Sequence, residues 1–121
     1  ERRGAKFATT QFFFSSDSYV ALTSRLRSAG SNLPVIAGVL PITNVKQLER
    51  MALLSGTPIP PLVTERIGRV EADSEAVRRE GVAIAISLCK ELLASAVPGI
   101  HFYTMNNSNS TIEIVKEIGL R

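Results

Sequence analysis

The sequence predicts an α/β fold with three βα units around a parallel sheet. Short runs of β-branched and apolar residues alternate strictly with longer segments of helical periodicity. The second short run, Pro34–Leu40, is apolar throughout, as expected of a parallel strand buried on both faces. Three such strands alone would leave two open edges. We therefore expect residues 1–121 to be one partial domain, the C-terminal portion of a (β/α)8 TIM barrel. A doubly wound sheet is the alternative, and no glycine-rich phosphate loop supports it.

The first part of the chain predicts a strand, a helix and a second strand. Phe7–Phe14 is rich in β-branched and aromatic residues, which favours a strand. Asp17–Ala29 carries apolar residues at helical spacing, with Asp17 as the expected N-cap and Gly30 as the stop. Pro34–Leu40 then provides the second strand, which completes the unit that joins two parallel strands.

The remainder predicts additional helices before the third βα unit. The expected elements are a helix from Thr43-Asn44 to Ser55, a short helix through Val63 and Ile67, a long helix from Asp73 or Ser74 to about Ala96, a strand Ile100–Thr104, and a last helix from Asn109 or Ser110 to Ile118. The connector Thr57–Pro61 is rigid, and prolines at the front of a helix cost little. The extra helix before the third strand indicates a larger barrel than three strands can form.

Composition narrows the class of protein. Hydrophobic residues make up 45% of the chain, enough for a real core, and the net charge of +3 is mild with scattered arginines. This pattern argues against nucleic-acid binding. No apolar run reaches the roughly 18–20 residues of a membrane span, and no secretory leader is present, so we expect a cytoplasmic protein. The single cysteine, Cys89, excludes an internal disulfide and a cysteine-rich metal site, and we interpret it as a small core residue.

Neutral polar side chains follow the predicted strands, at the ends where barrels of this class carry their chemistry. They are Gln11, Thr43, Asn44, Gln47, Tyr103 and Asn107. Gln11 interrupts an apolar run, so it is either a satisfied structural amide or a residue that points to a ligand. His101 is more simply a core residue than a general base. Without metal-ligand spacing or a nucleophile elbow, this surface suits a flat, amide-rich heterocycle better than hydrolysis.

Three motifs in register resemble the methylenetetrahydrofolate reductase family over essentially the whole chain. They are Thr10-Gln11-Phe12-Phe13-Phe14, Gly38-Val39-Leu40-Pro41-Ile42-Thr43-Asn44 with Lys46-Gln47, and His101-Phe102-Tyr103-Thr104-Met105-Asn106. The resemblance implies a flavin-dependent (β/α)8 barrel of one-carbon metabolism and methionine biosynthesis. Such an enzyme passes a hydride from NAD(P)H to FAD and then to 5,10-methylenetetrahydrofolate, giving 5-methyltetrahydrofolate.

The resemblance also assigns site residues. Gln11 matches a strand glutamine that contacts the folate pterin and, in the other half-reaction, the nicotinamide. Gln47 matches a second folate-contacting glutamine, and Tyr103 matches a tyrosine near the folate. Met51 stands where some members have a phenylalanine that covers the ligands. Asn107 stands where many members have an arginine that contacts the folate, so the charge for its anionic tail has to come from another base.

The resemblance places the general acid and most FAD contacts before Glu1. No catalytic residue is therefore expected in this segment, and the isolated 121 residues are predicted to be inactive. The loop Pro41–Asn44 favours NADH over NADPH, and the complete protein is expected to be a homo-oligomer. Two alternatives remain open: another flavin-barrel oxidoreductase resembling proline dehydrogenase, and a non-catalytic barrel fragment that assembles with another chain.

Overall fold

A computed structural model describes residues 1–120, which form a three-stranded sheet and five helices. The elements are β1 (Ala8–Phe12), α1 (Ser16–Ser28), β2 (Val35–Val39), α2 (Val45–Ser55), α3 (Pro61–Gly68), α4 (Ser74–Ala94), β3 (Ile100–Phe102) and α5 (Asn109–Glu117). Their order confirms the three predicted βα units and the additional helices before the third strand. No helix within residues 1–120 combines the length and the apolar character that crossing a bilayer requires.

The sheet is parallel, with the strand order β1–β2–β3. Its outer strands pair on one side only, as the sequence predicted. Alternate residues of β2 point to opposite faces. Val35, Ala37 and Val39 point to one face and belong to a buried cluster that includes residues of α4. Ile36 and Gly38 therefore point to the other face, with Thr9 and His101 as their partners in the register.

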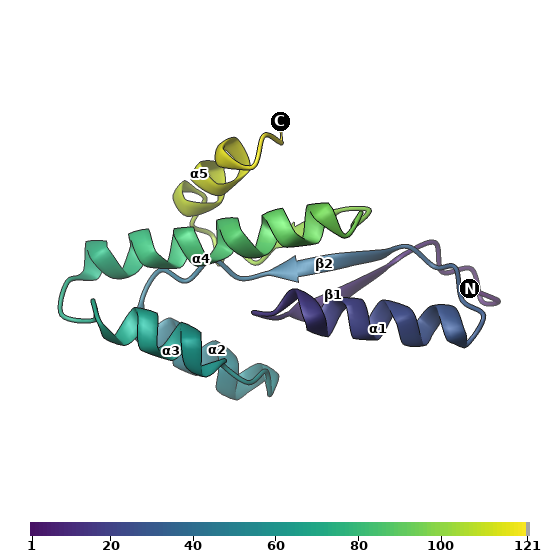
Figure 1. Cartoon of the computed structure of the whole chain (residues 1–121), viewed down its shortest axis with the longest axis horizontal. Helices are drawn as coiled ribbons and strands as arrows, with labels where there is room; N and C mark the ends of the chain where they lie inside the picture. Colours follow the sequence, from purple (N-terminus) through teal and green to yellow (C-terminus); the bar gives the residue numbers. More distant parts are fainter. Residues whose placement is uncertain (121) are drawn as a thin grey trace.

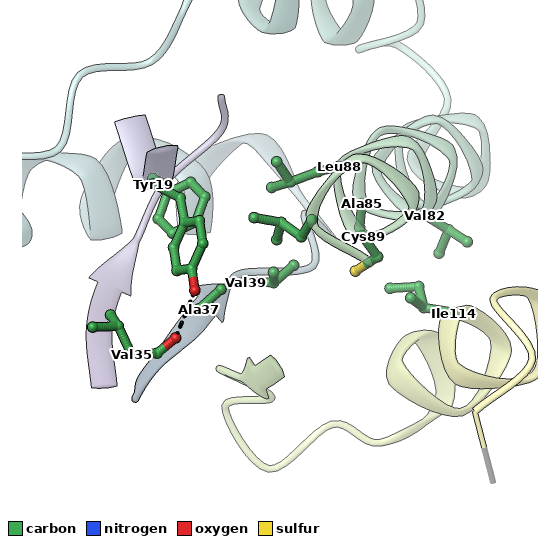
Figure 2. Close-up of a cluster of buried hydrophobic side chains, with 11 residues drawn as sticks. Tyr19, Val35, Ala37, Val39, Val82, Ala85, Leu88, Cys89 and Ile114 are labelled. Atoms are coloured by element: carbon green, nitrogen blue, oxygen red, sulfur yellow. Dashed lines mark hydrogen bonds between the residues drawn. The ribbon is translucent and has the colours of Figure 1, made fainter. Parts of the chain in front are cut away.

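The main core lies on one face of the sheet, beneath α4. Figure 1 shows α4 running along the sheet with α1 beside it, while α2 and α3 lie together on the side toward which β2 points. In Figure 2 the side chains of α4 meet those of β2, and Ile114 of α5 points toward Cys89. Tyr19 of α1 closes the cluster by donating a hydrogen bond from its hydroxyl to the Val35 carbonyl over 2.8 Å. The helices of this core cover one face of the parallel sheet, whereas a doubly wound sheet carries helices on both faces.

A second core holds the loop that follows β2. Ile42 in this loop packs with Leu48 of α2 and with residues of α3 and α4. Gly81 of α4 makes this approach possible, because a Cβ atom there would lie 2.0 Å from the Ile42 carbonyl oxygen. The missing side chain of Gly81 thus fixes where the β2–α2 loop lies, and with it the start of α2.

Several predicted boundaries are wrong by one turn or less. The first strand is shorter than Phe7–Phe14, the third ends at Phe102, and the long helix ends at Ala94. Ala96, the predicted end of that helix, is exposed and has a φ of 56°. The last two residues of the predicted helix instead form a turn that leads into β3, with Ser95 as the C-cap of α4 and Ala96 in the left-handed conformation.

Two predicted caps are also wrong. Asp17 lies in the first turn of α1, whose N-cap is Ser15, so it can act on the helix dipole but not as a cap. Ser110 lies within α5, and its buried hydroxyl has no hydrogen-bond partner among residues 1–120. Asn44 and Asp73 do cap their helices, each accepting from a backbone N–H group with its side-chain oxygen.

Candidate functional site

A β-bulge in β1 presents Gln11 at the open edge of the sheet. Thr9 pairs with Ile36 and Phe12 with Gly38, so Thr10 and Gln11 together stand opposite the single residue Ala37. Such an extra residue bends a strand and redirects its side chains. Gln11 is exposed, and its Oε1 accepts a hydrogen bond from the Phe12 N–H over 3.1 Å. The amide nitrogen keeps its two donors for a ligand.

Tyr103, which comes from the opposite edge of the sheet, holds the bulge in place. It follows β3, and its hydroxyl donates to the Thr10 carbonyl over 2.9 Å, so the side chain crosses β2. A Cβ atom at Gly38 would lie 2.9 Å from the Tyr103 ring and 2.8 Å from the Thr10 oxygen. The Gly38 N–H completes the arrangement by donating to Thr10 Oγ1 over 2.9 Å. Tyr103 therefore fixes the residue that precedes Gln11, and its hydroxyl is already bonded to the chain.

A hollow of about 380 Å³ lies beside the bulge, and we call it the Gln11 hollow. Its walls are β1 with the residues that follow it, one side of α1, and the α2–α3 connector. The Thr57 hydroxyl on this connector lies 3.4 Å from the Phe12 carbonyl oxygen. The lining residues are Thr10, Gln11, Phe12, Phe13, Phe14, Ser15, Ser18, Tyr19, Leu22, Gly56, Thr57, Pro58 and Pro60. None of them is charged, so this hollow offers apolar walls with amide and hydroxyl groups.

A second hollow of about 430 Å³ lies along α2, and we call it the basic hollow. Its lining residues are Lys46, Gln47, Arg50, Met51, Leu54 and Met105. Gln47 and Met51, predicted separately as site residues, thus meet in one place. The side chain of Gln47 is oriented by the Thr43 hydroxyl, which donates to its Oε1. Gln11 lines the other hollow, so the predicted residues fall into two groups.

The loop between β3 and α5 places the remaining predicted residue. Asn107 is exposed, lines neither hollow, and closes a turn by donating its N–H to the Thr104 carbonyl over 2.9 Å. His101, interpreted as a core residue from the sequence, is exposed and lies with its ring centroid 4.8 Å from that of Tyr103. The prediction of a core residue is therefore wrong. Side chains alternate along a strand, and this alternation puts His101 on the open face of the sheet.

The described residues support neither metal nor thiol chemistry. Within residues 1–120 no three His, Cys, Asp or Glu side chains gather as metal ligands. Burial among apolar side chains raises the pKa of the Cys89 thiol to about 11, so it stays protonated at neutral pH and acts as a core residue, as predicted.

Sequence reasoning did not single out Arg50 and Met105 as site residues, and it used Lys46 only as part of a motif. The signal was the spacing of positions 46, 47, 50, 51 and 54, which puts these residues on one side of a helix. Lysine and arginine on a helix surface usually indicate solvation. Only the neighbouring Met105 loop turns this side of α2 into the wall of a hollow.

Comparison with known proteins gives one family. The family model described as methylenetetrahydrofolate reductase matches residues 2–119. Over 117 residues the chain is 36% identical to methylenetetrahydrofolate reductase 1 of Schizosaccharomyces pombe, a match that covers 97% of this chain and 19% of that protein. It is 34% identical to methylenetetrahydrofolate reductase (NADH) 1 of Arabidopsis thaliana, with 97% and 20% covered. It is 35% identical to the probable methylenetetrahydrofolate reductase (NADPH) of Caenorhabditis elegans, with 97% and 18% covered. The chain thus spans about a fifth of the length of these relatives.

Proposed function

Because this chain belongs to the methylenetetrahydrofolate reductase family, we propose that it supplies the folate- and nicotinamide-binding segment of an FAD-dependent reductase. The reaction is the reduction of 5,10-methylenetetrahydrofolate to 5-methyltetrahydrofolate by a nicotinamide cofactor. The observation that carries the proposal is the bulge of β1, where Tyr103 and Gly38 hold the backbone so that the Gln11 amide is exposed beside an uncharged hollow.

Gln11 has the chemistry that a pterin requires. The pterin ring carries an amide-like edge with donors and acceptors side by side, and a carboxamide offers both kinds of group in one plane. The nicotinamide carboxamide presents the same pair of groups, so one residue can serve the two ligands in turn. A ring bound against the apolar walls of the Gln11 hollow would shield these hydrogen bonds from water, which strengthens them.

Residues 1–120 fit the ring end of FAD and not its phosphates. Amide and hydroxyl groups of Gln11, Thr43 and Gln47 suit the edge of a heterocycle. The Gln11 hollow contains no lysine or arginine, and no helix within residues 1–120 follows a glycine-rich phosphate loop. When bound, FAD would supply the hydride transfer between nicotinamide and folate. This segment would then bind and orient the two substrates, with the phosphates held elsewhere in the protein.

The general acid is also proposed to come from outside this segment. Neither hollow is lined by an aspartate or a glutamate. A proton donor has to stand within hydrogen-bond reach of the reacting nitrogen, and amides cannot replace it. The isolated chain is therefore proposed to be inactive, and the complete enzyme to be a cytoplasmic homo-oligomer, as the family resemblance implies.

NADH is proposed as the reductant. The names of the relatives include both NADH and NADPH forms. The support for NADH is the loop Pro41–Asn44, which resembles that of bacterial members of the family. A ratio of kcat/KM for NADPH over NADH above one in the full-length protein would contradict this choice.

The experiment is anaerobic stopped flow on the full-length protein, following flavin absorbance in each half-reaction. For Gln11→Glu we expect reoxidation by methylenetetrahydrofolate to slow by about tenfold to a hundredfold, because an ionised carboxylate cannot donate to the pterin. Reduction by NADH should change less, since a carboxylate still accepts from the nicotinamide NH2 group. Asn32→Asp, the same change at an exposed amide in the α1–β2 loop, is the control and should alter neither rate.

Two results would contradict the proposal. Unchanged folate reoxidation in Gln11→Glu would remove Gln11 from the folate site. A full-length protein without flavin absorbance, or one that reduces a different small substrate and not folate, would favour the alternatives of a non-catalytic barrel or another flavin-barrel oxidoreductase.

A further inference from the structure

We propose that Thr10 is the positioning residue for the Gln11 amide, because its hydroxyl replaces a backbone acceptor that the bulge of β1 gives up. Thr10 directly precedes Gln11 in β1, and its side chain is half-buried. The inference rests on the proposed function, in which Gln11 contacts the pterin, and it assigns the group that aims this amide. Thr10 acts through Gln11 and needs no contact of its own with the ligand.

The register of β1 shows which hydrogen bond the bulge replaces. The Ala8 N–H donates to the Pro34 carbonyl over 2.9 Å, so the backbone groups of Ala8 face β2. In a regular parallel ladder the next residue to face β2 is two positions further along, which is Thr10. With this register continued, the Gly38 N–H would donate to the Thr10 carbonyl. The register shifts after Thr9, and the two groups take other partners.

These other partners are side chains. The Thr10 carbonyl oxygen lies over Gly38 on the open face, 2.8 Å from the position of a Cβ atom there, and it accepts from the Tyr103 hydroxyl over 2.9 Å. The N–H of Gly38, a buried residue, donates to Thr10 Oγ1 over 2.9 Å. Thr10 therefore carries both hydrogen bonds that keep the bulge open, one through its carbonyl and one through its hydroxyl.

Loss of the Thr10 hydroxyl would favour the regular register. A buried N–H without an acceptor is costly, and the Thr10 carbonyl is the acceptor that the regular ladder offers to Gly38. Its return to the ladder would displace the Tyr103 hydroxyl. A shift of one residue turns a side chain to the other face of a sheet, so the Gln11 amide would leave the Gln11 hollow.

The position requires a short side chain with an acceptor on Cβ. Threonine and serine both place a hydroxyl there, within reach of a neighbouring backbone N–H. Valine has the shape of threonine and no acceptor, whereas serine keeps the acceptor and lacks the methyl group. Thr10→Val and Thr10→Ser therefore separate the hydrogen bond to Gly38 from the packing of the side chain.

The test is anaerobic stopped flow on the full-length protein at varied concentrations of methylenetetrahydrofolate, which yields an apparent Kd and a limiting rate of flavin reoxidation. In Thr10→Val we expect the Kd to rise about tenfold and the limiting rate to change less, because the lost contact is one of binding. In Thr10→Ser the Kd should stay within about twofold of the original value, because the hydroxyl remains.

Thr23→Val is the matched control. Thr23 is a half-buried threonine of α1 that lines neither the Gln11 hollow nor the basic hollow. Its hydroxyl also bonds to the backbone, donating to the Tyr19 carbonyl over 3.0 Å. This variant should change neither the Kd nor the limiting rate. Thr10→Ala, which removes the hydroxyl without adding a branched side chain, should reproduce the effect of Thr10→Val and replaces it if that variant does not fold.

A double-mutant cycle shows whether Thr10 acts through Gln11. In a Gln11→Ala background, Thr10→Val should raise the Kd by less than about twofold, because no amide remains to be aimed. A full additional loss in that background, or equal losses in Thr10→Val and Thr10→Ser, would overturn the inference. If Gln11→Ala alone leaves the Kd unchanged, the proposed function fails and the inference fails with it. If Gln11→Ala raises the Kd and Thr10→Val does not, only the role of Thr10 fails.

Discussion

On each face of the sheet a tyrosine hydroxyl donates a hydrogen bond to a strand carbonyl, but the two hydrogen bonds have different roles. On the covered face, Tyr19 donates its hydroxyl to the Val35 carbonyl over 2.8 Å, and the ring is buried in the main core. On the open face, Tyr103 donates to the Thr10 carbonyl over 2.9 Å, next to the exposed Gln11. One tyrosine closes the packing between helix and strand, and the other shapes a bulge. The difference teaches that the same contact can close a core or shape the strand that carries a ligand-binding amide, although the core residue Tyr19 also reaches the wall of the Gln11 hollow.

Burial follows the same division. The covered face contributes Val35, Ala37 and Val39 to a cluster with α4, whereas the open face presents Thr9, Gly38 and His101. Changes at these three β2 residues, which line neither hollow, should therefore alter stability and leave ligand affinity in the remaining folded protein unchanged. Changes on the open face and at the strand ends should do the reverse.

The largest effect is expected at Gly81, which joins the two regions. In Gly81→Ala the new Cβ atom would overlap the Ile42 carbonyl oxygen at 2.0 Å, and the β2–α2 loop would have to move. We expect a loss of about 3 kcal/mol or more in the free energy of unfolding, measured by urea denaturation of the full-length protein. Because α2 moves with the loop and carries Gln47, the KM for folate should also rise.

Gly68→Ala is the control for this prediction. Gly68 lies at the end of α3, and a Cβ atom there would meet nothing within 4 Å. Alanine favours helix over glycine by roughly 0.5–1 kcal/mol, so this variant should be as stable as the unmodified protein or slightly more so. If Gly81→Ala behaves like Gly68→Ala, the account of the β2–α2 loop is wrong.

The next effect comes from removing each tyrosine hydroxyl in turn. Tyr19→Phe removes the hydrogen bond to the Val35 carbonyl and should cost about 2 kcal/mol in stability. Tyr19 also lines the Gln11 hollow, but its ring stays in place, so the KM for folate should change less than in Tyr103→Phe. Tyr103→Phe should cost about 1 kcal/mol in stability, because its site is half-buried. It should also raise the KM for folate as the bulge loosens around Gln11. Urea denaturation and steady-state kinetics measure both quantities, and equal KM values in the two variants would remove the distinction between the faces.

The smallest effect is a pH dependence that arises on the covered face. The Cys89 pKa is raised to about 11 by burial, whereas an unfolded chain has a thiol pKa of about 8.5. Above about 8.5 the unfolded state therefore loses protons that the folded state keeps, and stability falls as the pH rises. The loss should reach about 1 kcal/mol by about pH 9.5 and should be absent in Cys89→Ala. Parallel pH curves for the two proteins would show that Cys89 is not buried in the native state.

The order of the elements could be predicted because it depends on local pattern. The apolar run of β2, the caps at Asn44 and Asp73 and the turn at Gly56 each act within a few residues. The bulge in β1 could not be predicted, since it depends on Tyr103, which is 93 positions further along the chain. Asp17 was misjudged as a cap because a second suitable residue, Ser15, precedes the helix.

The candidate site shows the same limit. Gln11, Gln47 and Met51 could be named from motifs, but their separation into two hollows depends on the loops that close each wall. The role of Tyr103 changed for a related reason. The sequence indicates a tyrosine near the ligand, whereas the structure bonds its hydroxyl to the backbone that carries the ligand-binding amide.

The most direct test of the account is a crystal structure of the full-length protein with a bound folate. We predict the pterin within hydrogen-bond distance of the Gln11 amide at the strand ends, and a contact between Gln47 and the folate. The Tyr103 hydroxyl should remain on the Thr10 carbonyl. A folate bound against α4 on the covered face, or a pterin that does not contact Gln11, would contradict the proposed role of the β1 bulge.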